Sequence, residues 1–232
     1  MTETVYKTIS FTLNKGIGHI ELNQPPSNHM TVGFFMELGR LTSELRKLKK
    51  LKGIVISGKG RHYSSGAHLE ELLGLVETGR HFHPSDNSAS LEIFLEENYR
   101  SFLFFDEAGI PVVSAIRGVC LGSALELALF SHFRFCGEDA VFGLPESTFN
   151  LMPGIGGISR LVKLAGTPRT LSLVLHGNTF DAQEAHIYKL VDRIIPKRKI
   201  VEIALEFTES IASGYRRELK PLYLKNFFRN EN

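Results

Sequence analysis

Apolar and polar positions alternate at the start of the chain in the way typical of β-strands. Residues 6–13 and 17–22 each switch between the two kinds of side chain, so we expect them to form a hairpin. The run 23–28 is rich in Asn and Pro, which favour turns. Beyond it, apolar residues recur at steps of three and four over residues 32–51. Thr31 stands where an N-cap is needed, so a helix is predicted there.

The rest of the chain predicts strands alternating with helices, which argues for an α/β architecture. Short apolar runs bounded by Gly or Pro predict strands, and longer amphipathic or apolar stretches predict helices. The expected strands are 53–58, 111–116, short strands within 134–143, and 190–194; the expected helices are 68–79, 91–106, 123–130 and three that begin near 158, 182 and 198. Residues 118–122 are expected to form a tight connection, and the polar run 80–90 a mobile surface loop.

Composition narrows the class of protein. The 232 residues suit one large domain, or one domain with a small appendage, and the formal net charge of +2 gives no electrostatic case for nucleic-acid binding. Cys120 and Cys136 suggest no disulfide framework, and the Cys and His spacing predicts no metal site. Because neither a signal peptide nor an apolar run of about 20 residues is seen, we expect a cytoplasmic protein that does not enter a membrane.

Glu126 lies in the run 122–130, in which nearly every face of the predicted helix is apolar. A buried carboxylate is costly without a partner or a cavity, and burial raises its pKa, as a general acid or base requires. However, Ser123 followed three residues later by Glu126 also matches a capping box, in which the glutamate would bond back to the Ser123 N–H. On this segment alone, capping and catalysis carry equal weight.

Two further segments hold candidate chemistry. Glu146 follows a proline in a predicted loop, which suits a positioned side chain, although an exposed loop glutamate is the commoner case. Residues 63–69 form a loop of small residues that leads into a helix, and such a turn leaves backbone N–H groups free to hold a developing oxyanion. An ordinary glycine-containing loop has the same composition, so neither segment decides the function by itself.

Five motifs in order resemble the enoyl-CoA hydratase/isomerase, or crotonase, superfamily. They are Asn-x-Pro-x-x-Asn at 23–28, Ser-Gly-Ala-x-Leu-Glu-Glu-Leu at 65–72, Gly-x-x-Leu-Gly-x-x-x-Glu-Leu-Ala at 118–128, Phe-Gly-x-Pro-Glu at 142–146, and Pro-Gly-x-Gly-Gly at 153–157, with Arg160-Leu161 after them. Each motif is modest alone, but five at sensible spacing are specific. The resemblance runs from about residue 5 to about residue 205.

The resemblance implies an α/β fold in which ββα units form a spiral of two near-perpendicular sheets surrounded by helices. Residues 1–197 would be the spiral core, and residues 198–232 a shortened C-terminal helical region. It also implies a homotrimer or a dimer of trimers.

The resemblance also implies the site. The backbone N–H groups of Ala67 and Ser123 would bind a thioester carbonyl oxygen, with Glu126 as general base and Glu146 as general acid. Substrate contacts would come from Pro26, Ser65, Gly66, His68, Leu69, Gly122 and Gly154. Two positions depart from the family pattern, because His68 stands in place of Asp and Ser123 in place of Gly.

The implied reaction is the addition of water across the C2=C3 double bond of a 2-enoyl thioester, or the reverse dehydration. The thioester carrier would be coenzyme A or an acyl-carrier protein, and no other cofactor is expected. Because many relatives keep only one of the two glutamates or neither, the presence of both favours hydration over isomerisation. Alternatives are an isomerase, a decarboxylase, a dehydratase acting on a carrier-bound chain, or a non-catalytic assembly subunit. Residues 72–105 are expected to build the far wall of the pocket.

Overall fold

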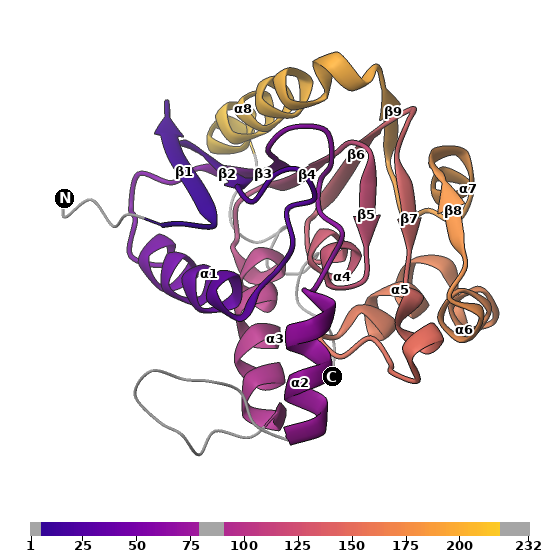
Figure 1. Cartoon of the computed structure of the whole chain (residues 1–232). Helices are drawn as coiled ribbons and strands as arrows, with labels where there is room; N and C mark the ends of the chain where they lie inside the picture. Colours follow the sequence, from indigo (N-terminus) through magenta and orange to yellow (C-terminus); the bar gives the residue numbers. More distant parts are fainter. Residues whose placement is uncertain (1–5, 79–90, 219–232) are drawn as a thin grey trace.

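Two β-sheets organise the chain in the computed structural model, which describes residues 6–78 and 91–218 (Figure 1). The larger sheet has the strand order β1-β2-β3-β4-β6-β9, and the smaller sheet the order β5-β7-β8. The strands are β1 (Ile9–Asn14), β2 (Ile17–Leu22), β3 (Gly53–Gly58), β4 (Val112–Ile116), β5 (Val119–Leu121), β6 (Phe133–Gly137), β7 (Val141–Gly143), β8 (Thr179–Asp181) and β9 (Arg193–Ile195). In the larger sheet β1 and β2 pair antiparallel, and every later pair is parallel.

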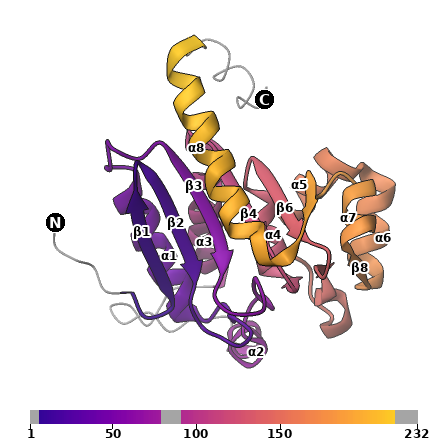
Figure 2. The ribbon, with the colours of Figure 1, turned by 90° about the horizontal axis from the view of Figure 1, so that it is seen from above.

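Helices cover both faces of the larger sheet. The α-helices are α1 (Val32–Leu45), α2 (Leu69–Thr78), α3 (Leu91–Glu107), α4 (Ser123–Leu129), α5 (Gly157–Ala165), α6 (Thr167–His176), α7 (Ala182–Ile187) and α8 (Ile200–Glu218), with short 3₁₀ turns at η1 (Pro145–Phe149) and η2 (Lys197–Lys199). Figure 2 shows α8 crossing one face while α1 and α3 lie behind the other. Along β3, Ile54 and Ile56 pack into the core with α1 and α3, and Val55 packs with α8. The central strands are therefore apolar on both faces.

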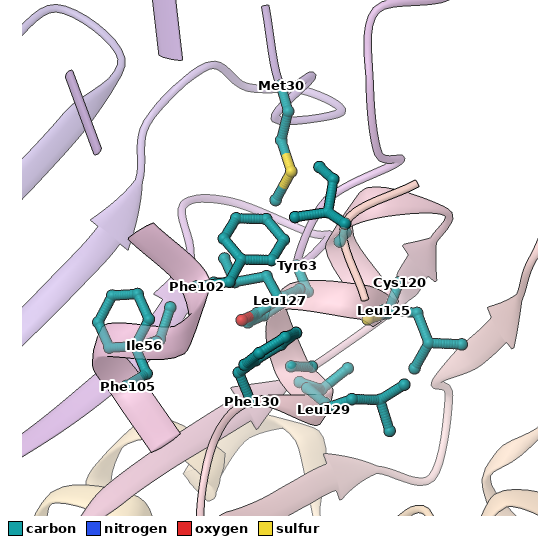
Figure 3. Packing of buried hydrophobic residues seen from close by; sticks show 14 of the residues in the cluster. Met30, Ile56, Tyr63, Phe102, Phe105, Cys120, Leu125, Leu127, Leu129 and Phe130 are labelled. Atoms are coloured by element: carbon teal, nitrogen blue, oxygen red, sulfur yellow. The ribbon is translucent and has the colours of Figure 1, made fainter. Parts of the chain in front are cut away.

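The helix that carries Glu126 is packed on all sides. Every residue of α4 is buried, and Figure 3 shows its apolar side chains among those of α3. The Phe102 ring of α3 lies 5.8 Å, centre to centre, from the ring of Phe130, the residue that ends α4. Dense packing of this kind restricts movement of α4. The helix therefore holds the Glu126 carboxylate in a fixed position.

Most predicted elements are confirmed, and the differences have local causes. The first helix ends at Leu45, because the N–H groups of Lys47, Leu48 and Leu51 turn to carbonyls three residues back. Leu48 and Leu51 still pack on the core, which explains the longer apolar pattern.

Further along, the expected connection 118–122 contains β5, Gly166 divides one predicted helix into α5 and α6, and β8 was not anticipated. The strand predicted at 190–194 begins only at Arg193. The predicted loop 80–90 lies outside the described residues. Over the described ranges, no helix combines the length and apolarity needed to cross a membrane.

Candidate active site

The loop before α2 is held so that one backbone N–H stays free. The Met30 N–H donates to the Gly66 carbonyl at 2.9 Å, and the His68 N–H donates to the Met30 carbonyl at 3.0 Å. In this parallel bridge the N–H of Ala67, between them, faces away from Met30. Within the described part of the chain, the Ala67 N–H has no acceptor. Gly66 enables the bend, because its φ is +86°.

A second free N–H lies at the start of α4. Gly122 is the N-cap residue, with φ +53°, and its carbonyl accepts the first helical bond from the Glu126 N–H. The Ser123 N–H, at the first helical position, has no acceptor among residues 6–78 and 91–218. A Cβ atom on Gly66 would come within 3.4 Å of the Ser123 nitrogen, so the Ala67 loop and the start of α4 are in contact. The two free donors therefore lie on adjoining segments.

Glu126 projects from α4 toward the start of α5. Its side chain is 1% exposed, and its Oε1 accepts hydrogen bonds from the Ile155 N–H at 2.9 Å and the Gly157 N–H at 2.8 Å. A Cβ atom on Gly157 would lie 2.5 Å from the Glu126 Cγ, so only glycine allows this approach. The capping-box interpretation is wrong. Gly122, not Ser123, is the N-cap of α4, and the Glu126 carboxylate accepts its hydrogen bonds from N–H groups at the start of α5. The free N–H groups and the positive dipole end of α5 bind the carboxylate in place of its own first turn.

The environment of Glu126 sets its proton affinity. Burial raises its pKa to about 7. The N–H groups of Gly154, Ile155 and Gly157 act in the opposite direction by stabilising the ionised form, and the nearby Glu146 carboxyl adds to the rise. The group can therefore exist in either protonation state near neutral pH.

Glu146 approaches the same place from η1. Its Oε1 lies 3.0 Å from where a Cβ on Gly122 would stand, so the carboxyl is packed on the N-cap of α4. Its Oε2 is buried and has no hydrogen-bond partner in the described structure. Burial raises its pKa to about 7 as well. A buried carboxyl oxygen without a partner is costly, which is typical of a group that awaits a ligand.

Several of the other predicted substrate contacts lie in the segment around the Ala67 loop and contact one another. Ser65 Oγ lies 3.0 Å from His29 Nδ1, the His29 and His68 rings are 5.4 Å apart, and His68 Nδ1 is 3.9 Å from the Glu71 carboxylate. These side chains thus contact one another and Glu71, and none of these three contacts involves the two buried glutamates.

Pro26 is exposed in a turn and follows a cis peptide bond, while Leu69 is 37% exposed at the start of α2. Gly154 is exposed and packs beside Leu95 of α3, which belongs to the segment predicted to form the far wall.

Sequence reasoning missed the partners of Glu126. The N–H groups of Ile155 and Gly157 carry no side-chain signal, and only the Pro-Gly-x-Gly-Gly motif marked the segment. Among the described residues, no group of three or more His, Cys, Asp or Glu side chains could hold a metal ion.

A sequence model of the enoyl-CoA hydratase/isomerase family matches residues 12–229, nearly the whole chain. The protein belongs to this family. A solved enoyl-CoA hydratase from Bacillus anthracis is 28% identical, with a TM-score of 0.78 over 89% of this chain and 77% of that one. A putative enoyl-CoA hydratase from Thermobifida fusca YX, solved in complex with CoA, is 24% identical, with a TM-score of 0.81 over 97% of this chain and 86% of that one. The predicted crotonase-type α/β fold is confirmed.

Among curated sequences, the fatty acid oxidation complex subunit alpha of Idiomarina loihiensis is 31% identical over 196 residues. The match covers 82% of this chain but 26% of that subunit. This member of the enoyl-CoA hydratase/isomerase family therefore spans about a quarter of the length of that relative.

Proposed function

We propose that this protein hydrates 2-enoyl thioesters. One observation carries the proposal: two carboxyl groups with pKa values raised to about 7, on Glu126 and Glu146, lie next to a helix start and a loop that present free backbone N–H groups. Pairs of carboxyl groups in such environments perform general acid–base chemistry, and preorganised N–H donors stabilise a developing oxyanion.

In the proposed reaction the thioester carbonyl oxygen accepts hydrogen bonds from the N–H groups of Ala67 and Ser123. Water sits between the two carboxyl groups. Ionised Glu126 removes a proton from the water as its oxygen adds to C3, and negative charge builds on the carbonyl oxygen as an enolate. Protonated Glu146 then delivers its proton to C2. The cycle ends with Glu126 protonated and Glu146 ionised, so a proton must pass between them or through solvent before the next turnover.

The electrostatics suit these roles near neutral pH. Glu126 accepts two N–H bonds, which favour its ionised form, whereas the Oε2 of Glu146 has no partner, which favours a proton there. The repulsion between the two carboxylates also disfavours double ionisation. One proton shared by the pair is the state that hydration needs.

The substrate carrier proposed is coenzyme A or an acyl-carrier protein, with no other cofactor. A homotrimer or dimer of trimers in the cytoplasm is proposed by analogy with the family. Size-exclusion chromatography with light scattering tests the oligomer, and parallel assays with crotonyl-CoA and a crotonyl carrier protein distinguish the two carriers.

The central test is the hydration of crotonyl-CoA, followed by loss of enoyl-thioester absorbance. We expect Glu126→Gln and Glu146→Gln each to lower kcat by about 10²- to 10⁴-fold, the usual contribution of a general acid or base. Glu206→Gln, on an exposed position of α8, is the matched control and should retain full activity. Unchanged rates in both active-site variants would refute the proposal.

Isomerisation is the alternative within the family. A 3-enoyl-CoA offered to the wild-type protein distinguishes it, because an isomerase converts this substrate to the 2-enoyl thioester without adding water. Accumulation of the 2-enoyl product with no 3-hydroxyacyl thioester would assign isomerase activity in place of hydration.

A further inference from the structure

One arginine joins the three helices around Glu126. Arg160 lies on α5, and its guanidinium donates to the Asp106 carboxylate of α3 at 2.7 Å. The same guanidinium lies 4.4 Å from the centre of the Phe130 ring, which ends α4. The side chains of Arg160 and Asp106 are only 12% and 19% exposed, so the ion pair is largely shielded from solvent. A shielded, hydrogen-bonded pair holds its geometry better than an exposed one.

Arg160 is one helical turn beyond the residues that bind Glu126. Side chains at this spacing share a helix face, so anchoring Arg160 also orients the first turn of α5. That turn carries the Gly157 N–H, and the Ile155 N–H lies two residues earlier, just before the N-cap Gly156. The position of α5 relative to α4 therefore determines whether both donors reach the carboxylate.

The turn before α5 is tightly packed against two aromatic rings. Gly156 has φ +87°, and a Cβ atom there would lie 2.7 Å from the Tyr99 ring and 3.1 Å from the Phe130 ring. The backbone thus rests directly on aromatic rings of α3 and α4, and Arg160 binds the same two helices one turn later. Two separate contacts with α3 and α4 therefore fix the start of α5.

We propose that Arg160 is a positioning residue, which keeps the N–H groups of Ile155 and Gly157 on the Glu126 carboxylate through its contacts with Asp106 and Phe130. The expected effect of Arg160 on catalysis rests on the proposed hydratase function. The expected effect of Arg160 on the proton affinity of Glu126 does not depend on that function. Loss of the anchor weakens the two N–H bonds, and Glu126 then holds its proton more tightly.

The test compares Arg160→Gln with Asp106→Asn. If Arg160 acted on Glu126 only through its charge, removing the cation would raise the Glu126 pKa and removing the anion would lower it. If it acts by positioning, both variants loosen α5 and both raise that pKa, by about one unit for the loss of well-formed hydrogen bonds to the carboxylate. Shifts in opposite directions, or no shift, would overturn the proposal.

The pKa is read from a ¹³C NMR titration of protein labelled at glutamate Cδ, with the Glu126 signal assigned by its absence in Glu126→Gln. Arg160→Lys keeps the positive charge but not the planar stacking on Phe130. It should raise the Glu126 pKa by less than Arg160→Gln does. It is the milder variant to use if Arg160→Gln folds poorly. Arg169→Gln is the matched control, because the Arg169 guanidinium lies 4.2 Å from the centre of the Tyr188 ring, which belongs to neither α3 nor α4. Its titration should match the wild type.

Crotonyl-CoA kinetics add the catalytic readout. Arg160→Gln should lower kcat about tenfold or more with little change in KM, as expected when a general base is displaced, and should move the acidic limb of the kcat–pH profile to higher pH. A wild-type protein without hydratase activity would refute the proposed function, while the NMR titration would still decide the role of Arg160. A normal titration and normal kinetics in Arg160→Gln would refute the positioning role alone.

Discussion

Burial of Glu126 should make the protein less stable as pH rises through the neutral range. The unfolded chain releases the Glu126 proton near pH 4.5, whereas the native protein holds it until about pH 7. Below pH 4.5 both states are protonated and the group contributes nothing to pH dependence. Between the two values the native state binds more protons than the unfolded state, so the free energy of unfolding falls as pH rises. Above about pH 7 the loss is complete.

The size of this effect follows from the pKa difference. A rise from 4.5 to about 7 corresponds to about 3 kcal/mol, at about 1.4 kcal/mol per pKa unit. Solvent screens this group little, because the residue is 1% exposed. Glutamine cannot ionise, but its oxygen can still accept the bonds from Ile155 and Gly157. Glu126→Gln should therefore gain about 3 kcal/mol relative to the wild type between about pH 4.5 and pH 7.5.

Urea unfolding at several pH values, followed by circular dichroism, measures this difference. Glu37→Gln is a control of opposite sign. Burial alone would raise the Glu37 pKa, but hydrogen bonds from the Thr8 hydroxyl and the N–H groups of Lys7 and Thr8 lower it overall. Stability from Glu37 is thus present above pH 4.5 and lost in acid, so the deficit of Glu37→Gln should shrink as pH falls. A pH-independent difference between Glu126→Gln and the wild type would refute the reasoning.

Three further predictions test the local structure. Gly122→Ala should cost about 2 kcal/mol in urea unfolding and reduce crotonyl-CoA hydration, because φ there is +53° and the new methyl group would meet Glu146 Oε1 at 3.0 Å; normal activity would contradict this. Thr31→Ala removes the hydroxyl that accepts the Phe34 N–H and should lower stability by about 1 kcal/mol, whereas Thr31→Ser should not. Phe102→Ala should cost about 3–5 kcal/mol by calorimetry or urea unfolding, since the ring is fully buried; a loss below about 1 kcal/mol would mean that the core can collapse around it.

Elements governed by local contacts were predictable. Thr31 caps α1, and Asp181 forms a full capping box with Glu184, because both interactions involve residues three apart. The end of α1 was not predictable, since Leu48 continues an apolar pattern that serves packing in a non-helical turn. Periodicity reports which side chains are buried, and it cannot report whether the backbone that buries them is still helical.

The candidate site shows the same division. The motifs alone predicted the family, which the comparisons confirm. They also predicted the two glutamates and the N–H donors of Ala67 and Ser123 as site residues, and these roles stay predictions. The motifs could not exclude a capping box for Glu126, because its local sequence matches one. The N–H groups that bind its carboxylate instead lie 29 and 31 residues away.

The sequence by itself determined the kinds of chemical group in the site, the alternation of strands and helices, and the glycines that allow close backbone approach. Only the tertiary structure decided which groups meet. The raised pKa values of Glu126 and Glu146 arise from burial, which is a property of the assembled core and not of either segment. The anchor formed by Arg160 joins three helices whose proximity no local pattern records.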